Sequence, residues 1–186
     1  MPEDEQARKT IKLLRGLRQV RQLRAEALPQ QIISDVLEVA RWTGSAGNSQ
    51  PWEFVIIRER ETLQALAHLE GVAQVGKAAL AIVILMTGTP ELAEVLSYDE
   101  GRVVERIMLA ASAYGVGSAM GMFRGEGVEQ ARTLLAIPAQ YRVRTVVALG
   151  YPDIAGQRAR PRSAAGRKPL SELVHEEHFR SGNGNQ

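Results

Sequence analysis

The chain has 186 residues and a formal net charge of +2, with 45% hydrophobic and 24% charged residues. This length suits one globular domain, and the composition excludes an intrinsically disordered chain. The complete absence of cysteine excludes thiolate metal sites, cysteine nucleophiles and disulfide frameworks.

The first third of the chain is expected to contain two helices, a polar loop and a strand. Apolar residues between basic ones predict an amphipathic helix over residues 8–24 that unwinds near Arg18. Pro29 suits the start of a second helix. Glycine, serine and amide residues predict a loop over 43–51, and residues 52–57 read as a strand.

Helices and strands alternate through the rest of the chain, which predicts a layered α/β or α+β domain. The run AALAIVILM is short and apolar on both faces, as in a central buried strand. Gly115 suits the position that follows a helix C-terminus. The expected elements are helices over 59–69, 102–114 and 126–136, strands over 78–86 and 143–150, and a short helix starting at Pro169.

Two glycine-rich segments imitate nucleotide-binding motifs. Residues 71–78 end in alanine, which has no hydroxyl for magnesium, and they lead into a strand instead of following one. Gly115, Gly117 and Gly121 imitate a dinucleotide fingerprint, but a helix precedes them where a strand is required. A helix cap followed by close backbone packing explains these glycines, and close approach to a flat ligand stays open.

The polar residues indicate neither a metal site nor a hydrolase. His175 and His178 are three residues apart, and the sequence supplies neither cysteine nor a nearby third histidine as a further ligand. The motif G-x-S-x-G is absent.

No membrane partner is expected. The longest uncharged stretch, residues 107–123, is too short and too polar to span a bilayer. The N-terminal residues lack the apolar core of a secretory signal, so we expect a cytoplasmic protein.

Basic side chains gather near the two ends of the chain. Residues 1–24 carry seven, residues 156–170 carry five, and together these are 12 of the 23. If the fold joins the ends, they suit one anion site, because guanidinium groups match phosphate geometry. Solvated charge and a nucleic-acid patch are the alternatives. Only 5% of residues are aromatic, so we expect no nucleic-acid partner.

The loop over 44–52 offers serine hydroxyls, two amides and unhindered backbone groups. Such groups supply donors and acceptors without charge, as a ligand with carbonyl and N–H edges requires. An ordinary polar turn with Trp52 in the core explains the same residues.

Here the sequence resembles the nitroreductase-like family of FMN-dependent oxidoreductases. ARWTGSAGNSQPWEFVII, residues 40–57, is close to the family pattern A-x-x-[small]-P-S-x-x-N-x-Q-P-W-x-F. LRQVRQLRAEALP (17–29) resembles its R-R-S-x-R-x-F segment, and ASAYGVGSAMGMF resembles its central helix and the stretch after it. VVALGYP and GRKPLSELVH resemble the late strand and the C-terminal element.

The resemblance implies an α+β fold, namely a three-layer α/β/α sandwich whose mixed, mostly antiparallel sheet is flanked by helices. It implies one FMN-binding domain over residues 1–186, with a basic C-terminal arm over 151–175. The polar tail over 181–186 is expected to be disordered. The family forms homodimers with the flavin at the interface, so a homodimer is implied.

The resemblance also implies FMN as the cofactor and assigns its contacts. The arginine-rich segment near residue 18 and the C-terminal element would hold the phosphate, and the 44–52 loop of the partner subunit would contact the flavin or its ribityl chain. The backbone near residue 120 would approach the reactive edge of the ring. The assigned residues are Arg18, Gln19, Arg21, Ser45, Asn48, Gln50, Met120, Gly121, Arg167 and Lys168.

The implied activity is ping-pong hydride transfer from NAD(P)H, through flavin N5, to a nitroaromatic, a quinone or a similar acceptor. No catalytic side chain and no metal are expected, because the flavin carries the chemistry. A flavin enzyme with other chemistry, such as reductive dehalogenation or flavin breakdown, and a non-catalytic flavin-binding protein stay open as alternatives.

Overall fold

The computed structural model describes residues 2–155 and 166–179, and the chain divides into two units, residues 1–156 and 157–186. The predicted tail over 181–186 and residues 156–165 of the predicted basic arm lie outside the described residues. The second unit contributes one short 3-10 turn, Leu170–Glu172, which follows Pro169 as expected.

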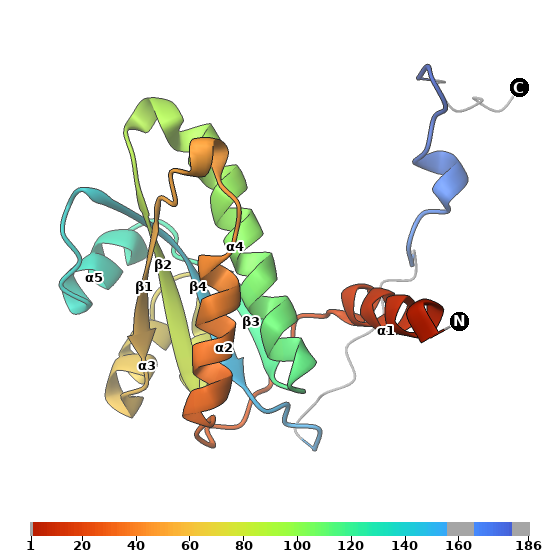
Figure 1. Ribbon diagram of the computed structural model, residues 1–186. Helices are drawn as coiled ribbons and strands as arrows, with labels where there is room; N and C mark the ends of the chain where they lie inside the picture. Colours follow the sequence, from red (N-terminus) through yellow and green to blue (C-terminus); the bar gives the residue numbers. More distant parts are fainter. Residues whose placement is uncertain (1, 156–165, 180–186) are drawn as a thin grey trace, which may run out of the picture. The chain divides into compact units, whose positions relative to one another are not determined.

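A four-stranded antiparallel sheet with the order β1-β2-β4-β3 lies at the centre of the first unit (Figure 1). The two inner strands are buried along most of their length, because helices cover both faces of the sheet. The predictions of strands near 52–57, 78–86 and 143–150 are confirmed. The strands are β1 (Trp52–Ile57), β2 (Leu80–Thr87), β3 (Gly117–Met122) and β4 (Tyr141–Gly150).

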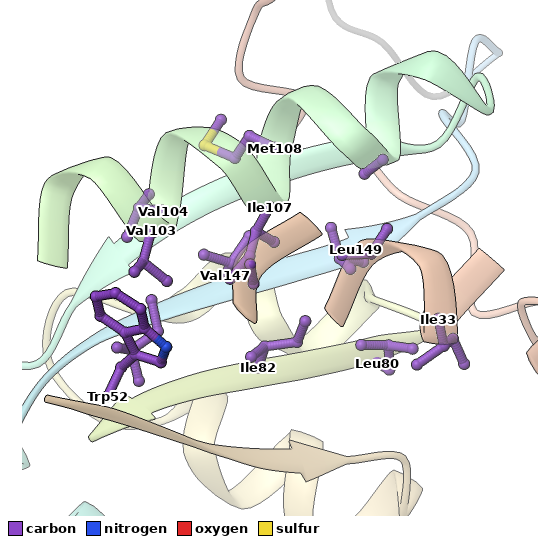
Figure 2. Packing of buried hydrophobic residues seen from close by; sticks show 14 of the residues in the cluster. Ile33, Trp52, Leu80, Ile82, Val103, Val104, Ile107, Met108, Val147 and Leu149 are labelled. Carbon is purple, nitrogen blue, oxygen red and sulfur yellow. The ribbon is translucent and has the colours of Figure 1, made fainter. Parts of the chain in front are cut away.

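The sheet separates two apolar cores, which confirms the three-layer sandwich. Along β2, Ile82 points into the core beneath α2 and α4, whereas Val83 points into the core beneath α3 and α5. Figure 2 shows the first core, in which Ile107 of α4 and Val147 of β4 lie near Ile82. The covering helices are α2 (Gln30–Arg41), α3 (Arg60–Ala67), α4 (Ala93–Ala113) and α5 (Gly127–Leu134).

The N-terminal helix ends at Gly16, close to Arg18, where the sequence analysis predicts that it unwinds. Helix α1 (Pro2–Gly16) ends before Arg18, and residues 17–24 are extended instead of helical. The Val20 N–H donates to the Ser118 carbonyl at 2.7 Å, and the Arg24 N–H donates to the Tyr151 carbonyl at 2.8 Å. Pairing with the sheet therefore replaces the helix, and the parallel bridge between Gln19 and Ser118 makes the sheet mixed.

Strand β3 is not apparent from the sequence, because GSAMGM contains two glycines and no β-branched residue. Pairing with β4 forms it, with Gly117 opposite Gly150. Before the strand, α4 ends in a Schellman motif, in which the Val116 N–H donates to the Ala111 carbonyl at 3.0 Å. Gly115 has a φ of 70°, so its predicted position after the helix is confirmed.

Helix α4 is also longer than predicted, since it begins at Ala93 instead of near residue 102. Its first turns carry exposed apolar side chains and glutamates, so no clear apolar stripe marks their start in the sequence. The extra turns reach the 43–51 loop, which makes α4 the element that both candidate binding regions contact.

We expect Gly150→Ala to destabilise the junction between residues 17–24 and the sheet. An added methyl group would lie 2.8 Å from the Arg24 carbonyl oxygen and 3.2 Å from the Ala79 nitrogen. Neither backbone atom moves aside easily, so the cost is that of overpacking, about 1–3 kcal/mol in urea unfolding.

Gly101→Ala is the matched control, because nothing lies within 4 Å of its Cβ position on α4. Alanine favours the helix more than glycine does, so this variant should gain up to about 1 kcal/mol. Equal effects of the two substitutions would contradict the close packing at Gly150.

Candidate functional site

The outer edge of β3 has a backbone stretch that no other strand covers. On the side that faces β4 the Phe123 N–H donates to the Arg144 carbonyl at 2.9 Å. On the outer side the Ser118 carbonyl accepts from the Val20 N–H. Residues of an antiparallel strand direct their peptide groups alternately to the two sides, so Met120 faces outward and Gly121 faces β4. Within residues 2–155 no backbone group pairs with Met120 on the outer side.

Gly121 lies beneath the turn that connects α3 to β2. A Cβ atom there would lie 2.1 Å from Gln74 Nε2 and 3.0 Å from the Gly71 carbonyl oxygen. Close backbone packing therefore explains this glycine. The turn, which includes the 3-10 segment Ala73–Lys77, follows α3 and leads into β2, whereas a nucleotide-triphosphate loop follows a strand and opens a helix.

A cavity of about 180 Å³ lies beside the start of β3. Ser118 is one of the lining residues, and its hydroxyl is buried and has no hydrogen-bond partner among the described residues. Arg18 donates from Nη1 to the carbonyls of Arg15, at 2.8 Å, and Leu17, at 2.6 Å. A guanidinium has five N–H donors, so the others remain for an anion. Other lining residues are Gly16, Val20, Ser112, Gly115, Val116, Gly117 and Pro152.

The loop over 43–51 is the second candidate region. Asn48 and Gln50 have φ values of 55° and 48°, next to Gly47 at 57°. Non-glycine residues in this left-handed region carry strain and are frequent at functional sites. The Gln50 N–H donates to Ser45 Oγ at 2.8 Å, and the Asn48 N–H donates to the Ser45 carbonyl at 3.1 Å. These bonds leave the side chains of Asn48 and Gln50 exposed.

The two regions lie toward opposite ends of α4 (Figure 1). The Ala46 N–H donates to Asp99 Oδ2 at 3.2 Å, near the start of the helix. The cavity beside Arg18 reaches Ser112, 13 residues later, which at 1.5 Å per residue is about 20 Å along the axis. One chain therefore does not bring the loop residues to Arg18.

Three other residues that the resemblance assigns to the phosphate are exposed, and their positions do not define a binding role. Arg21 is exposed beside the cavity segment. Arg167 and Lys168 are exposed within the second unit, and their assignment stays a prediction. Gln19 does lie at the β3 edge, through its backbone bridge to Ser118.

Asp99 and Ser118 are site residues that the sequence analysis missed. Asp99 lies on the buried face of α4 together with Leu96 and Val103. The sequence offers little signal for Asp99, because the predicted helix begins near residue 102 and no clear apolar stripe marks the earlier turns. Nothing in the sequence distinguishes Ser118, because its importance comes from the cavity around it.

Histidines and acidic residues do not gather into a metal-binding group in the described part of the chain. Residues 2–155 and 166–179 contain no cluster of three or more His, Asp or Glu side chains that could hold a metal ion. His175 packs against Phe179, with ring centroids 4.5 Å apart. Among these residues, no helix has both the length and the apolar character needed to cross a bilayer.

A hydrogen-bonded cluster of charged and aromatic side chains lies at the entrance to the 43–51 loop. The Glu38 carboxylate accepts from Arg41 Nη2 at 2.5 Å, from Arg41 Nε at 2.8 Å and from Trp42 Nε1 at 2.7 Å. Together these hydrogen bonds lower the pKa of Glu38 from 4.5 to about 2, and those from Arg41 contribute more than the one from Trp42.

Comparisons with known proteins agree with this architecture. A family model described as "Nitroreductase family" matches residues 14–94, which include Arg18 and the 43–51 loop. A protein of Archaeoglobus fulgidus with the inferred name NADH dehydrogenase/NAD(P)H nitroreductase is 32% identical over 148 residues. The match covers 76% of this chain and 84% of that protein.

Two solved structures have the same fold. An FMN-dependent nitroreductase from Clostridium difficile matches with a TM-score of 0.78 at 23% identity, over 91% of this chain and 99% of that chain. An inferred nitroreductase from Desulfovibrio desulfuricans, solved in complex with FMN, matches with a TM-score of 0.70 at 28% identity. That match covers 92% of this chain and 98% of the other.

We expect the Glu38 carboxyl to titrate with a pKa of about 2 in the folded protein, against 4.5 for the ordinary group. Because this pKa is lower in the folded than in the unfolded protein, the ionised Glu38 carboxylate stabilises the folded state. That stabilisation is complete above about pH 4.5 and is lost as the pH falls through about 2. Side-chain carbon NMR measures this pKa. Trp42→Phe, which removes one donor and keeps Arg41, should raise the pKa part of the way. A pKa near 4.5 in the parent protein would contradict the hydrogen-bonded cluster.

Proposed function

The chain belongs to the nitroreductase family, and from that premise we propose that it is an FMN-dependent NAD(P)H oxidoreductase. The observation that carries the proposal is the polar cradle at the β3 edge. It combines the outward peptide of Met120 with the guanidinium of Arg18, which lines the cavity at the start of the same strand. The FMN-bound relative from D. desulfuricans, at 28% identity, supports the choice of ligand.

The donor set suits the polar parts of FMN. Arg18 and Arg21 would supply charge-assisted hydrogen bonds to the phosphate. Gln19 would contribute through its place beside Ser118 at the same edge.

The outward N–H of Met120 would donate to the polar edge of the ring, and Gly121 permits the close packing that fixes this strand. A fixed backbone donor stabilises negative charge that develops during reduction, as in an oxyanion hole. Bound FMN would supply the redox chemistry, which carries electrons from NAD(P)H to a nitroaromatic, a quinone or a similar acceptor. The side chains of this protein would bind and orient, without a catalytic nucleophile.

We further propose a homodimer in which the 43–51 loop of one chain completes the β3 cradle of the other. The separation of about 20 Å along α4 supports this arrangement, because Ser45, Asn48 and Gln50 cannot reach Arg18 of their own chain without leaving Asp99. In a two-fold dimer each loop meets the other chain's cradle, which forms two identical sites. A cytoplasmic location stays a prediction.

The first experiment is the visible absorption spectrum of the purified protein, with mass spectrometry of the ligand that heat releases. We expect an oxidised flavin spectrum, FMN as the released ligand, and anaerobic bleaching by NADH or NADPH. A protein that cannot be loaded with FMN would contradict the proposal. FMN that neither nucleotide bleaches would instead indicate the non-catalytic flavin-binding alternative.

Complementation tests the shared site. Arg18→Ala removes a phosphate donor and Gln50→Ala removes a loop amide, so each homodimer should lose most of its FMN and activity. A mixed dimer contains one site with both intact halves, so co-expression with two affinity tags should restore about half of the wild-type FMN content. Mixed dimers as empty as the parents would show that both halves act within one chain.

A further inference from the structure

The 43–51 loop is poorly held by its own residues. Residues 46–50 are all exposed, so apolar burial contributes little to their shape. Gly47, Asn48 and Gln50 are all in the left-handed backbone region, which is unfavourable for the two non-glycine residues. The hydrogen bonds of Ser45 to Asn48 and Gln50 begin and end within the loop. They give it a shape but do not attach its tip to the rest of the protein.

One side chain of α4 attaches the loop tip. Asp99 Oδ2 accepts from the Ala46 N–H at 3.2 Å, and Asp99 Oδ1 lies 3.4 Å from Arg102 Nη1. The Asp99 side chain is 4% exposed, so water competes little for its oxygens, whereas that of Arg102 is 54% exposed. We call Ala46, Asp99 and Arg102 the Asp99 latch.

A glycine of the loop leaves room for the Arg102 side chain of the latch. A Cβ atom at Gly44 would lie 2.8 Å from Arg102 Nη2, so the absence of a side chain lets the guanidinium lie against the loop. The carboxyl end of the loop is attached separately, where the Thr87 N–H donates to the Pro51 carbonyl at 2.8 Å. Within residues 2–155, Asp99 is therefore the side chain outside the loop that bonds to its tip.

We propose that Asp99 is a positioning residue, which acts through Ala46 to hold Ser45, Asn48 and Gln50 in the arrangement that receives the flavin. This inference rests on the proposed function for its ligand, whereas the latch itself is a property of the single chain. A carboxylate that accepts a backbone N–H away from water makes a stronger bond than a neutral acceptor. Loss of the latch frees the tip, and binding must then order it again.

Three variants separate the parts of the latch. Asp99→Ala removes the acceptor and should raise the FMN dissociation constant roughly tenfold or more. Asp99→Asn keeps an oxygen that can accept from Ala46 and should bind FMN within about threefold of the parent. Arg102→Ala breaks only a half-exposed ion pair, so its effect should be smaller than that of Asp99→Ala.

Val104→Ala is the control for general destabilisation. Val104 is buried on the same helix, 4% exposed, and packs in the core beneath α4. Its truncation should lower the melting temperature of the FMN-free protein while leaving the FMN dissociation constant within about twofold. A merely structural role for Asp99 would give this same pattern.

Hydrogen exchange of the FMN-free protein tests the latch without any flavin. Peptides that cover residues 44–50 should exchange faster in Asp99→Ala than in the parent, and the Asn variant should restore most of the protection. Unchanged exchange together with an unchanged FMN dissociation constant would overturn the latch. A parent protein that binds no FMN would overturn the proposed function instead, and the exchange measurement would still decide the latch.

Discussion

The antiparallel ladder of β2 and β4 has both faces buried, and the positions of the other elements follow from it. Ile82 and Val83 are neighbours on β2, yet each is fully buried in a different core. Burial of apolar surface stabilises a fold by about 25 cal/mol per Å², so a strand covered on both faces is held from two sides. Binding groups are left to the edges, where residues 17–24 and the 43–51 loop attach.

Backbone groups and small residues form most of the candidate site. The outward peptide of Met120, the close packing at Gly121 and the left-handed residues of the loop all depend on where the chain is held. Such groups have no function in an extended chain. The strain at Asn48 and Gln50 persists because Ser45 and Asp99 bond the loop from two directions.

The structure divides the positive charge of the N-terminal segment into two kinds. On α1, Arg8 and Lys9 form exposed ion pairs with Asp4 and Glu5, which suit solvated helix charge and contribute little stability. Arg18 instead lines a cavity at the start of β3, where only two carbonyls of its own segment bond its Nη1. Charge composition alone therefore did not separate the solvated cations from those available to an anion.

The sequence by itself determined the helices and strands with regular apolar patterns, among them β2 and α2, and the loop whose residues resemble the family motif. It did not reveal β3, because GSAMGM lacks strand propensity and pairs only when β4 lies beside it. It indicated that the first helix unwinds near Arg18 but not the cause, which is that hydrogen bonds to Ser118 and Tyr151 hold residues 17–24 extended. Local preferences act over a few neighbours, whereas Asp99 bonds to a residue 53 positions away, so only the tertiary structure decided how the site is held.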